Sequence, residues 1–216
     1  MNWVLGLNKE SLYDDWNDKN FVLESIKNNE FFFDYASNEL QNNKEFVLEA
    51  VKINGYVLQC TSKEFQNDKE IVLEALKNNT NTLDYASNEL KNDKEVVLKA
   101  IERNAMSLYY ASKKIKNDKD VVLAAIKNNR YSFKYASKEL RKDKKFVLKV
   151  LKNNGFCLEY ASKELRNDKN LIMRALKNIY FIDYIQFKKN NNEFRIEILF
   201  EPNLLKKSFR EILKRY

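Results

Sequence analysis

The sequence predicts an all-α fold, a right-handed-type α-solenoid of two-helix repeats with 25 residues per repeat and a capping segment at each end. Three observations lead to this class. The string "NDKEVVLKAI" at residues 92–101 returns in closely similar form every 25 residues. The 216 residues include only three glycines and one proline, which leaves little material for tight hairpins. Each repeat also has too many apolar sides to be stable alone.

The repeat pattern divides the chain into three segments. Residues 1–16 do not fit the repeat and are predicted to form an N-terminal cap, with Trp3 and Trp16 covering the first layer. Residues 17–178 hold six complete repeats and the first helix of a seventh. Residues 179–216 are predicted to form a degenerate repeat and a C-terminal cap that ends in an amphipathic helix after Pro202. Residues 182–190 resemble a second helix of the repeat, and residues 193–200 are predicted as helix, with a strand as the alternative.

The first helix of each repeat is predicted to run for about twelve residues and to begin after an Asp or Asn. This residue can accept hydrogen bonds from the free amides of the first turn. The column contains Asp18, Asn43, Asp68, Asp93, Asp118, Asp143 and Asp168. Lysines follow it, from Lys19 to Lys169, and are expected to pair with nearby carboxylates or water. The helix is predicted to end in a left-handed residue. The residues at this position are Asn29, Asn54, Asn79, Asn104, Asn129 and Asn154.

Both helices of the repeat have apolar residues on more than one side. In the first helix of the fourth copy, an arc of about 200° is apolar. It contains Val96, Val97, Leu98, Ala100 and Ile101. In the second helix Leu83, Ala86 and Leu90 share one face, while Tyr85 points nearly opposite. The tyrosine column is therefore predicted to pack between repeats rather than to stack on bases. Its members are Tyr35, Tyr85, Tyr110, Tyr135 and Tyr160.

Charge is distributed unevenly along the chain. Residues 1–91 carry 9 Lys and Arg against 16 Asp and Glu, a net of −7, whereas residues 92–216 carry 30 against 15, a net of +15. The polar arc of the second helix, at the spacing of Asp34, Asn38 and Gln41, becomes cationic in copies four to six. This predicted basic stripe contains Lys113, Lys116, Lys134, Lys138, Arg141, Lys163 and Arg166. Such a field attracts an acidic partner, although the alternative is that these residues serve only solubility.

The composition offers little for catalysis. Histidine is absent, which removes the commonest general base and metal ligand. Cys60 and Cys157 lie in packing columns, so neither a disulfide nor a reactive thiol is expected. No catalytic, cofactor-binding or metal-binding residue is predicted. No apolar run reaches the roughly 18 residues of a membrane span. The expected location is the cytoplasm, or delivery as an effector without a classical signal peptide.

The combination of the "NDKEVVLKAI" pattern of residues 92–101 with the "YASNEL" pattern of residues 85–90 resembles a bacterial tandem-repeat family catalogued as domain of unknown function 4116. The resemblance extends over residues 17–178. It implies a helical repeat and occurrence in bacterial proteins, including some secreted effectors. It implies no catalytic residues.

The leading hypothesis is a non-enzymatic scaffold for protein–protein interaction, in which the basic stripe engages an acidic partner surface. The alternative is binding of nucleic acid, or of a nucleoprotein as its inhibitor, through the same stripe. An enzyme similar to the helical-repeat DNA glycosylases is a third interpretation. No membrane, cofactor or small-molecule substrate is predicted as a partner.

Overall fold

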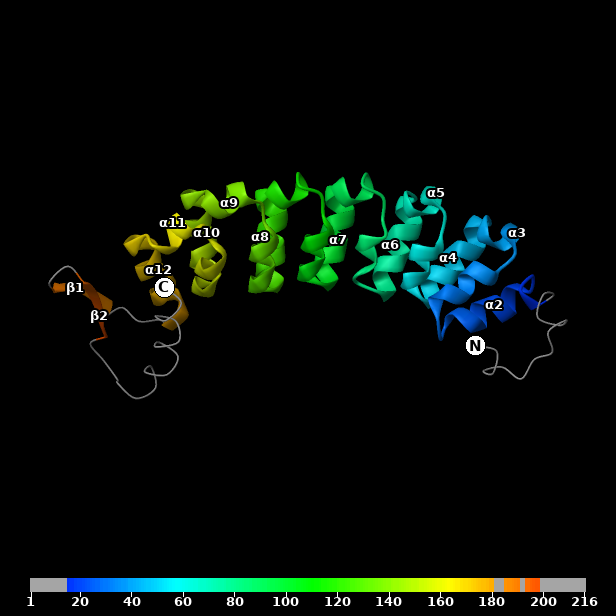
Figure 1. The fold of residues 1–216 in the computed structure, drawn as a ribbon, viewed down its shortest axis with the longest axis horizontal. Coiled ribbons are helices and arrows are strands. Elements are labelled where there is room, and N and C mark those ends of the chain that lie inside the picture. The colour runs from blue at the N-terminus through cyan, green and yellow to red at the C-terminus, as the bar shows by residue number, and fades with distance from the viewer. Residues whose placement is uncertain (1–14, 181–184, 191–192, 199–216) are drawn as a thin grey trace. The chain divides into compact units, whose positions relative to one another are not determined.

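The computed structural model describes residues 15–180, 185–190 and 193–198. These residues form a series of helical repeats and one pair of strands (Figure 1). The chain divides into two compact units, unit 1 (Met1–Ala124) and unit 2 (Ala125–Tyr216), and each is described by itself. The predicted class, an all-α fold of tandem repeats, is confirmed for the helical part. The residues assigned to the two caps lie outside the described residues, except residues 15–16, residues 179–180, Ile185–Asn190 and Glu193–Ile198.

Each repeat contains three short elements in a fixed order. The first is an α-helix: α2 (Lys19–Ile26), α4 (Lys44–Ile53), α6 (Lys69–Asn78), α7 (Lys94–Arg103), α8 (Lys119–Asn128), α10 (Lys144–Asn153) and α12 (Lys169–Tyr180). The second is a 3₁₀ helix: η1 (Glu30–Tyr35), η2 (Gly55–Cys60), η3 (Thr82–Asp84), η5 (Ala105–Tyr110), η7 (Arg130–Tyr135) and η8 (Gly155–Tyr160). The third is a single helical turn: α3 (Asn38–Gln41), α5 (Lys63–Gln66), η4 (Leu90–Asn92), η6 (Ile115–Asn117), α9 (Lys138–Lys142) and α11 (Lys163–Arg166).

The Asp and Asn column begins each first helix, as predicted. The Asp18 carboxylate accepts the Phe21 N–H at 2.9 Å. The Asp68 carboxylate accepts the N–H groups of the second and third helical residues, at 2.9 and 3.3 Å. These bonds satisfy amides that have no partner inside the helix.

The prediction that asparagines end the first helix in the left-handed conformation is wrong. Asn54 is extended, with φ −140°, and its side-chain oxygen accepts the Tyr56 N–H at 3.1 Å. Asn29, Asn104, Asn129 and Asn154 cap the following 3₁₀ helix in the same way. Asn is well suited to this role because its short side chain can bond the backbone two residues ahead.

The predicted second helix is interrupted in every complete repeat. In the first repeat Ala36 and Ser37 are extended, with ψ 153° at both residues, and the Ser37 hydroxyl accepts the Leu40 N–H at 3.4 Å. The serine thus begins a new helical turn instead of continuing the old one, because its side chain competes with the helical bond. The equivalent serines Ser62, Ser87, Ser112, Ser137 and Ser162 make the same bond.

The predicted apolar faces form the core. In unit 1 the residues of α7 named above are buried, except Leu98, which is half-buried. Leu83, Ala86 and Leu90 are also buried. Neighbouring first helices of unit 1, such as α4 and α6, pack against each other. Burial on two sides explains why the apolar arc is wider than that of an ordinary surface helix.

Ion pairs and backbone hydrogen bonds join successive repeats within each unit. In unit 1 the Lys69 ammonium lies 2.9 Å from the carboxylate of Asp93, the cap of the next repeat. In unit 2 Lys144 lies 2.6 Å from Asp168. These lysines lower the pKa of both aspartates. The Ser162 N–H also donates to the carbonyl of Arg141 in the preceding repeat, at 2.8 Å.

Strands β1 (Ile185–Asn190) and β2 (Glu193–Ile198) follow the last helix and pair antiparallel, with Ile185 opposite Ile198. The prediction of helix for residues 182–190 and 193–200 is therefore wrong wherever these residues are described. Apolar and polar residues alternate throughout β2 and over residues 185–188 of β1, which is the period of a strand rather than of a helix.

Candidate functional site

The seven residues of the predicted basic stripe lie in both units. Lys113 and Lys116 belong to unit 1, and the other five belong to unit 2. Their exposure differs by column. The four lysines Lys113, Lys134, Lys138 and Lys163 are exposed, whereas Lys116, Arg141 and Arg166 are half-buried. The predicted common arc on one helix does not exist, because each second helix is divided into a 3₁₀ helix and a separate turn.

The half-buried column has a structural role in the first three repeats. The Gln41 amide donates to the carbonyls of Asp34 and Ala36, at 3.1 and 2.8 Å. The Gln66 amide donates to three carbonyls in the same region of the second repeat, and the Lys91 ammonium donates to the Asp84 carbonyl at 2.5 Å. The side chain at this position thus satisfies carbonyls at the end of the preceding 3₁₀ helix.

The cations at the same position in later repeats are also partly withdrawn from solvent. Burial lowers the pKa of Lys116, and its ammonium lies 5.5 Å from the centre of the Tyr109 ring. The Nε atoms of Arg141 and Arg166 are buried and have no hydrogen-bond partner among the described residues. These three side chains are therefore less accessible to a partner than the exposed lysines are.

Carboxylates lie among the exposed lysines of unit 2. Hydrogen bonds from its own N–H and from the Ser137 hydroxyl lower the pKa of Glu139, and the charge of Lys138 contributes. Glu164 has the same environment in the next repeat, beside Lys163. The surface is a mixture of charges in which the cations predominate.

The 3₁₀ helices carry a second surface feature, which the sequence patterns did not predict. One column of side chains at the start of these helices is exposed or half-buried: Phe31, Tyr56, Asn81, Met106, Tyr131 and Phe156. Phe31 is 52% exposed and Tyr131 44%. The tyrosine column that was predicted to pack between repeats is half-buried at four positions, and Tyr35 is 64% exposed. Aromatic rings therefore line the surface of the 3₁₀ helices.

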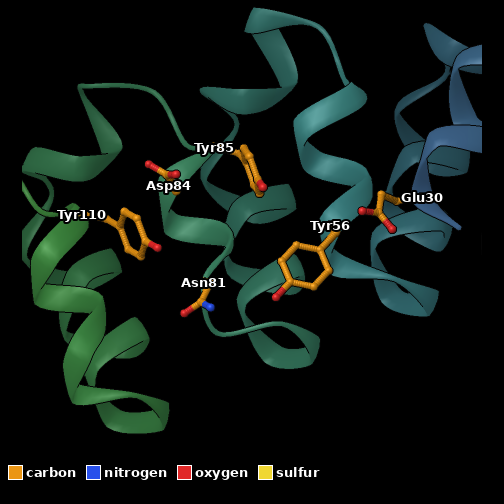
Figure 2. Close-up of a pocket in the computed structure, with 6 residues that line it drawn as sticks. All are labelled: Glu30, Tyr56, Asn81, Asp84, Tyr85 and Tyr110. Atoms are coloured by element: carbon orange, nitrogen blue, oxygen red, sulfur yellow. The ribbon is translucent and has the colours of Figure 1, made fainter.

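In unit 1 the rings of Tyr56, Tyr85 and Tyr110 line a groove with a volume of about 340 Å³. Its lining, here called the tyrosine groove, consists of Glu30, Tyr56, Asn81, Asp84, Tyr85 and Tyr110. Figure 2 shows these side chains turned toward the space between successive repeats. The rings of Tyr56 and Tyr85 meet edge to face, with centroids 6.5 Å apart.

The tyrosine groove has a negative electrostatic environment. Burial, followed by the charge of Asp84, raises the pKa of Tyr85 and of Tyr110. Burial and then the charges of Asp34 and Glu30 raise the pKa of the neighbouring Cys60 to about 12. A carboxylate raises the pKa of a phenol or thiol because it opposes formation of a second negative charge.

Unit 2 fills the corresponding position with a cation of its own. Arg130 occupies the place that Glu30 has in the first repeat. Its guanidinium lies 4.8 Å from the centre of the Tyr131 ring and 4.5 Å from that of Phe156. It also donates to the Tyr131 hydroxyl at 2.9 Å. This is the geometry of a cation–π contact with two rings.

Neither cysteine has the properties of a nucleophile. Burial raises the pKa of Cys157 to about 12, so its thiol is protonated at neutral pH. In the described residues no three His, Cys, Asp or Glu side chains gather as metal ligands. No helix in the described part of the chain is long and apolar enough to cross a bilayer.

The fold and these surfaces define a tandem helical-repeat protein of the scaffold type. The sequence pattern of the family described as domain of unknown function (DUF4116) matches residues 18–66, 43–91, 68–116, 93–141 and 143–188. The chain belongs to this family. Every match begins at a capping residue of the Asp and Asn column, and the first four matches each cover two structural repeats. Comparisons with curated proteins and with solved structures give no match.

Proposed function

We propose that this chain is a non-enzymatic scaffold that binds a protein partner, and that the basic stripe contacts an acidic surface of that partner. The observation that carries the proposal is the exposure of Lys134, Lys138 and Lys163 in unit 2, and of Lys113 in unit 1. Repeat scaffolds present equivalent side chains of successive repeats in columns, and like charges in a column give a field that steers an oppositely charged partner.

The chemistry of the described side chains supports a binding role. Both thiols are protonated at neutral pH, since burial raises the pKa of Cys60 and Cys157 to about 12. The chain contains no histidine to act as a base. A scaffold needs neither group, because its affinity comes from the complementarity of surfaces.

The test is charge reversal at three exposed lysines of equivalent position, Lys113→Glu, Lys138→Glu and Lys163→Glu. The wild-type protein and the triple variant are immobilised and exposed to a lysate of the native host, and bound proteins are identified by mass spectrometry. We expect the wild type to retain acidic proteins that the variant loses. Far-UV circular dichroism should be unchanged, because these side chains are exposed.

The matched control reverses three exposed lysines at the ends of first helices, Lys52→Glu, Lys127→Glu and Lys152→Glu. It changes the net charge by the same amount at a different position of the repeat. Capture by the control should equal that by the wild type. If the stripe variant captured the same proteins as the wild type, the basic stripe would not be the binding surface.

Binding of nucleic acid through the same stripe is the second candidate, because residues 92–216 carry a net charge of +15. Glu139 and Glu164 lie among the cations and would face the uniformly negative phosphates of a nucleic acid, whereas the acidic surface of a protein can also place a cation or a neutral donor opposite them. A labelled single-stranded oligonucleotide should therefore bind weakly even at about 50 mM salt, where phosphate contacts are strongest. Tight binding that falls steeply between about 50 and 200 mM salt would favour the nucleic-acid function instead.

A further inference from the structure

The tyrosine groove of unit 1 combines the two groups that recognise an organic cation. Three phenol rings, from Tyr56, Tyr85 and Tyr110, line it together with the carboxylates of Glu30 and Asp84. The face of an aromatic ring attracts a cation, and a carboxylate adds a full negative charge. The raised pKa values of the tyrosines agree with this arrangement.

The described residues do not supply that cation. Among the described residues, no lysine or arginine side chain lies within ion-pair distance of the Glu30 or Asp84 carboxylate. The Lys91 ammonium reaches the main-chain carbonyl of Asp84 instead. The Glu30 carboxylate has a neutral partner, the Gln59 amide, at 3.1 Å.

Unit 2 shows how the repeat holds a guanidinium. Arg130 lies over Tyr131 of its own repeat and Phe156 of the next, and it bonds a phenol hydroxyl. The equivalent rings in unit 1 are Phe31 and Tyr56, and the equivalent of Arg130 is Glu30. At the same position of the repeat, unit 2 therefore carries a guanidinium that contacts two rings, and unit 1 carries a carboxylate.

We propose that the tyrosine groove binds the guanidinium of an arginine side chain of a partner protein. Arginine fits better than lysine because its planar group stacks on rings and offers five N–H donors to carboxylates and hydroxyls. The net charge of −7 on residues 1–91 attracts such a group. The contact is independent of the basic stripe, so either proposal can fail without the other.

The experiment is a titration of the full chain, with ¹³C-labelled tyrosine rings, followed by NMR. The probe is Nα-acetyl-arginine amide, and the lysine and trimethyllysine amides are parallel probes. The chain has 12 tyrosines, which single Tyr→Phe variants assign. We expect the arginine probe to shift Tyr56, Tyr85 and Tyr110 in a saturable manner, with affinity several-fold higher than that of the lysine probe.

Two variants test the carboxylates. Asp84→Asn should weaken binding about three- to tenfold, the effect of one charge contact near a surface. Glu30→Arg should abolish the shifts, because the new side chain would lie between Phe31 and Tyr56 as Arg130 lies between its own rings. Glu64→Arg, an exposed site outside the groove with the same change of charge, should bind the probe like the wild type.

The converse variant adds a gain of function. Arg130→Glu should make Tyr131 and Tyr160 respond to the arginine probe, since it gives unit 2 the charge pattern of unit 1. The proposal is overturned if all tyrosines shift equally, if Glu30→Arg still binds, or if the lysine or trimethyllysine probe binds more tightly than arginine.

Discussion

Glu30 in unit 1 and Arg130 in unit 2 occupy the same position of the repeat and give neighbouring groups opposite electrostatic surroundings. In unit 1 the charges of Asp34 and Glu30 act with burial to raise the pKa of Cys60. In unit 2 burial raises the pKa of Cys157 while Arg130 opposes it. The two units therefore share a backbone but present different charges on it.

This difference distinguishes the positions of the repeat that are required for its fold from those whose side chain can vary. The capping column contains only Asp and Asn, and the bonds to backbone amides explain that restriction. The position of Glu30 and Arg130 tolerates very different side chains. In order along the chain it holds Glu30, Gly55, Thr80, Ala105, Arg130 and Gly155. Variation at such a position can change a ligand without changing the fold.

The cores of the two units should respond alike to the largest perturbation. Phe33 and Phe133 are 1% and 0% exposed, and each packs against a phenylalanine in the first helix of the next repeat, with ring centroids 6.1 and 6.2 Å apart. Phe33→Ala and Phe133→Ala should each cost about 3 to 5 kcal/mol of unfolding free energy. Urea unfolding followed by circular dichroism measures it. A cost near zero in either unit would show that the cores are not equivalent.

Gly55 tests whether every member of the variable column is free to change. A Cβ atom there would lie 2.4 Å from the Ala75 carbonyl oxygen and 2.9 Å from the Asn79 side-chain oxygen. Gly55→Ala should therefore destabilise the protein by about 1 to 3 kcal/mol. The matched change Ala105→Gly, at the same column, should cost only about 0.5 to 1 kcal/mol. Denaturant midpoints of the two variants give the comparison, and a neutral Gly55→Ala would contradict the close approach.

The capping column should respond in proportion to the bonds removed. Asp93→Ala loses both the cap and the ion pair with Lys69 and should cost about 1 to 2 kcal/mol. Asp93→Asn keeps the cap, as Asn43 does in the second repeat, and should cost less than about 1 kcal/mol. Thermal unfolding of both variants measures the difference. If the two variants lost the same stability, the ion pair with Lys69 rather than the cap would account for the whole loss.

The same ion pairs predict the response to acid. Because Lys69 and Lys144 lower the pKa of Asp93 and Asp168 in the folded state, the stabilisation is present above the unfolded pKa of about 3.9 and is lost as the pH falls through the folded value. The melting temperature should therefore drop between about pH 5 and pH 2. Asp93→Asn should show a smaller drop than the wild type, and a parallel pH profile would contradict the assignment.

The features that the sequence predicted correctly are local. The capping bonds of Asp18 and Asp68 reach only three residues ahead, and the buried faces of α7 follow from its period. The asparagines were misassigned because left-handed closure and an extended cap use the same residue type. The interruption at the serines was not predicted because the Tyr-Ala-Ser pattern is also compatible with the interior of a helix. In the structure the Ser37 hydroxyl accepts the Leu40 N–H and begins a new helical turn.

The tyrosine groove could not be predicted from local patterns, because its lining comes from four successive repeats. Glu30 and Tyr110 belong to η1 and η5, and only the packing of the repeats brings them to one groove. The signal that could have identified it is the presence of the acidic residues Glu30 and Asp84 at the 3₁₀ helices of the repeats that also carry Tyr56, Tyr85 and Tyr110 or adjoin them. The basic stripe was predicted as one surface, but the burial of Arg141 and Arg166 divides it into exposed and covered columns.

The smallest effect on stability is expected at Arg130, and it decides whether the charged position is separable from the fold. A cation–π contact at a partly exposed site contributes about 0.5 to 1 kcal/mol, so Arg130→Ala should lower the unfolding free energy by no more than that. Lys152→Ala, at an exposed lysine near the end of α10, is the matched control and should be nearly neutral. Chemical denaturation resolves these values. If Arg130→Ala lowered the unfolding free energy by more than about 2 kcal/mol, Arg130 would be required for the fold. The opposite charges of the two units would then reflect folding rather than recognition.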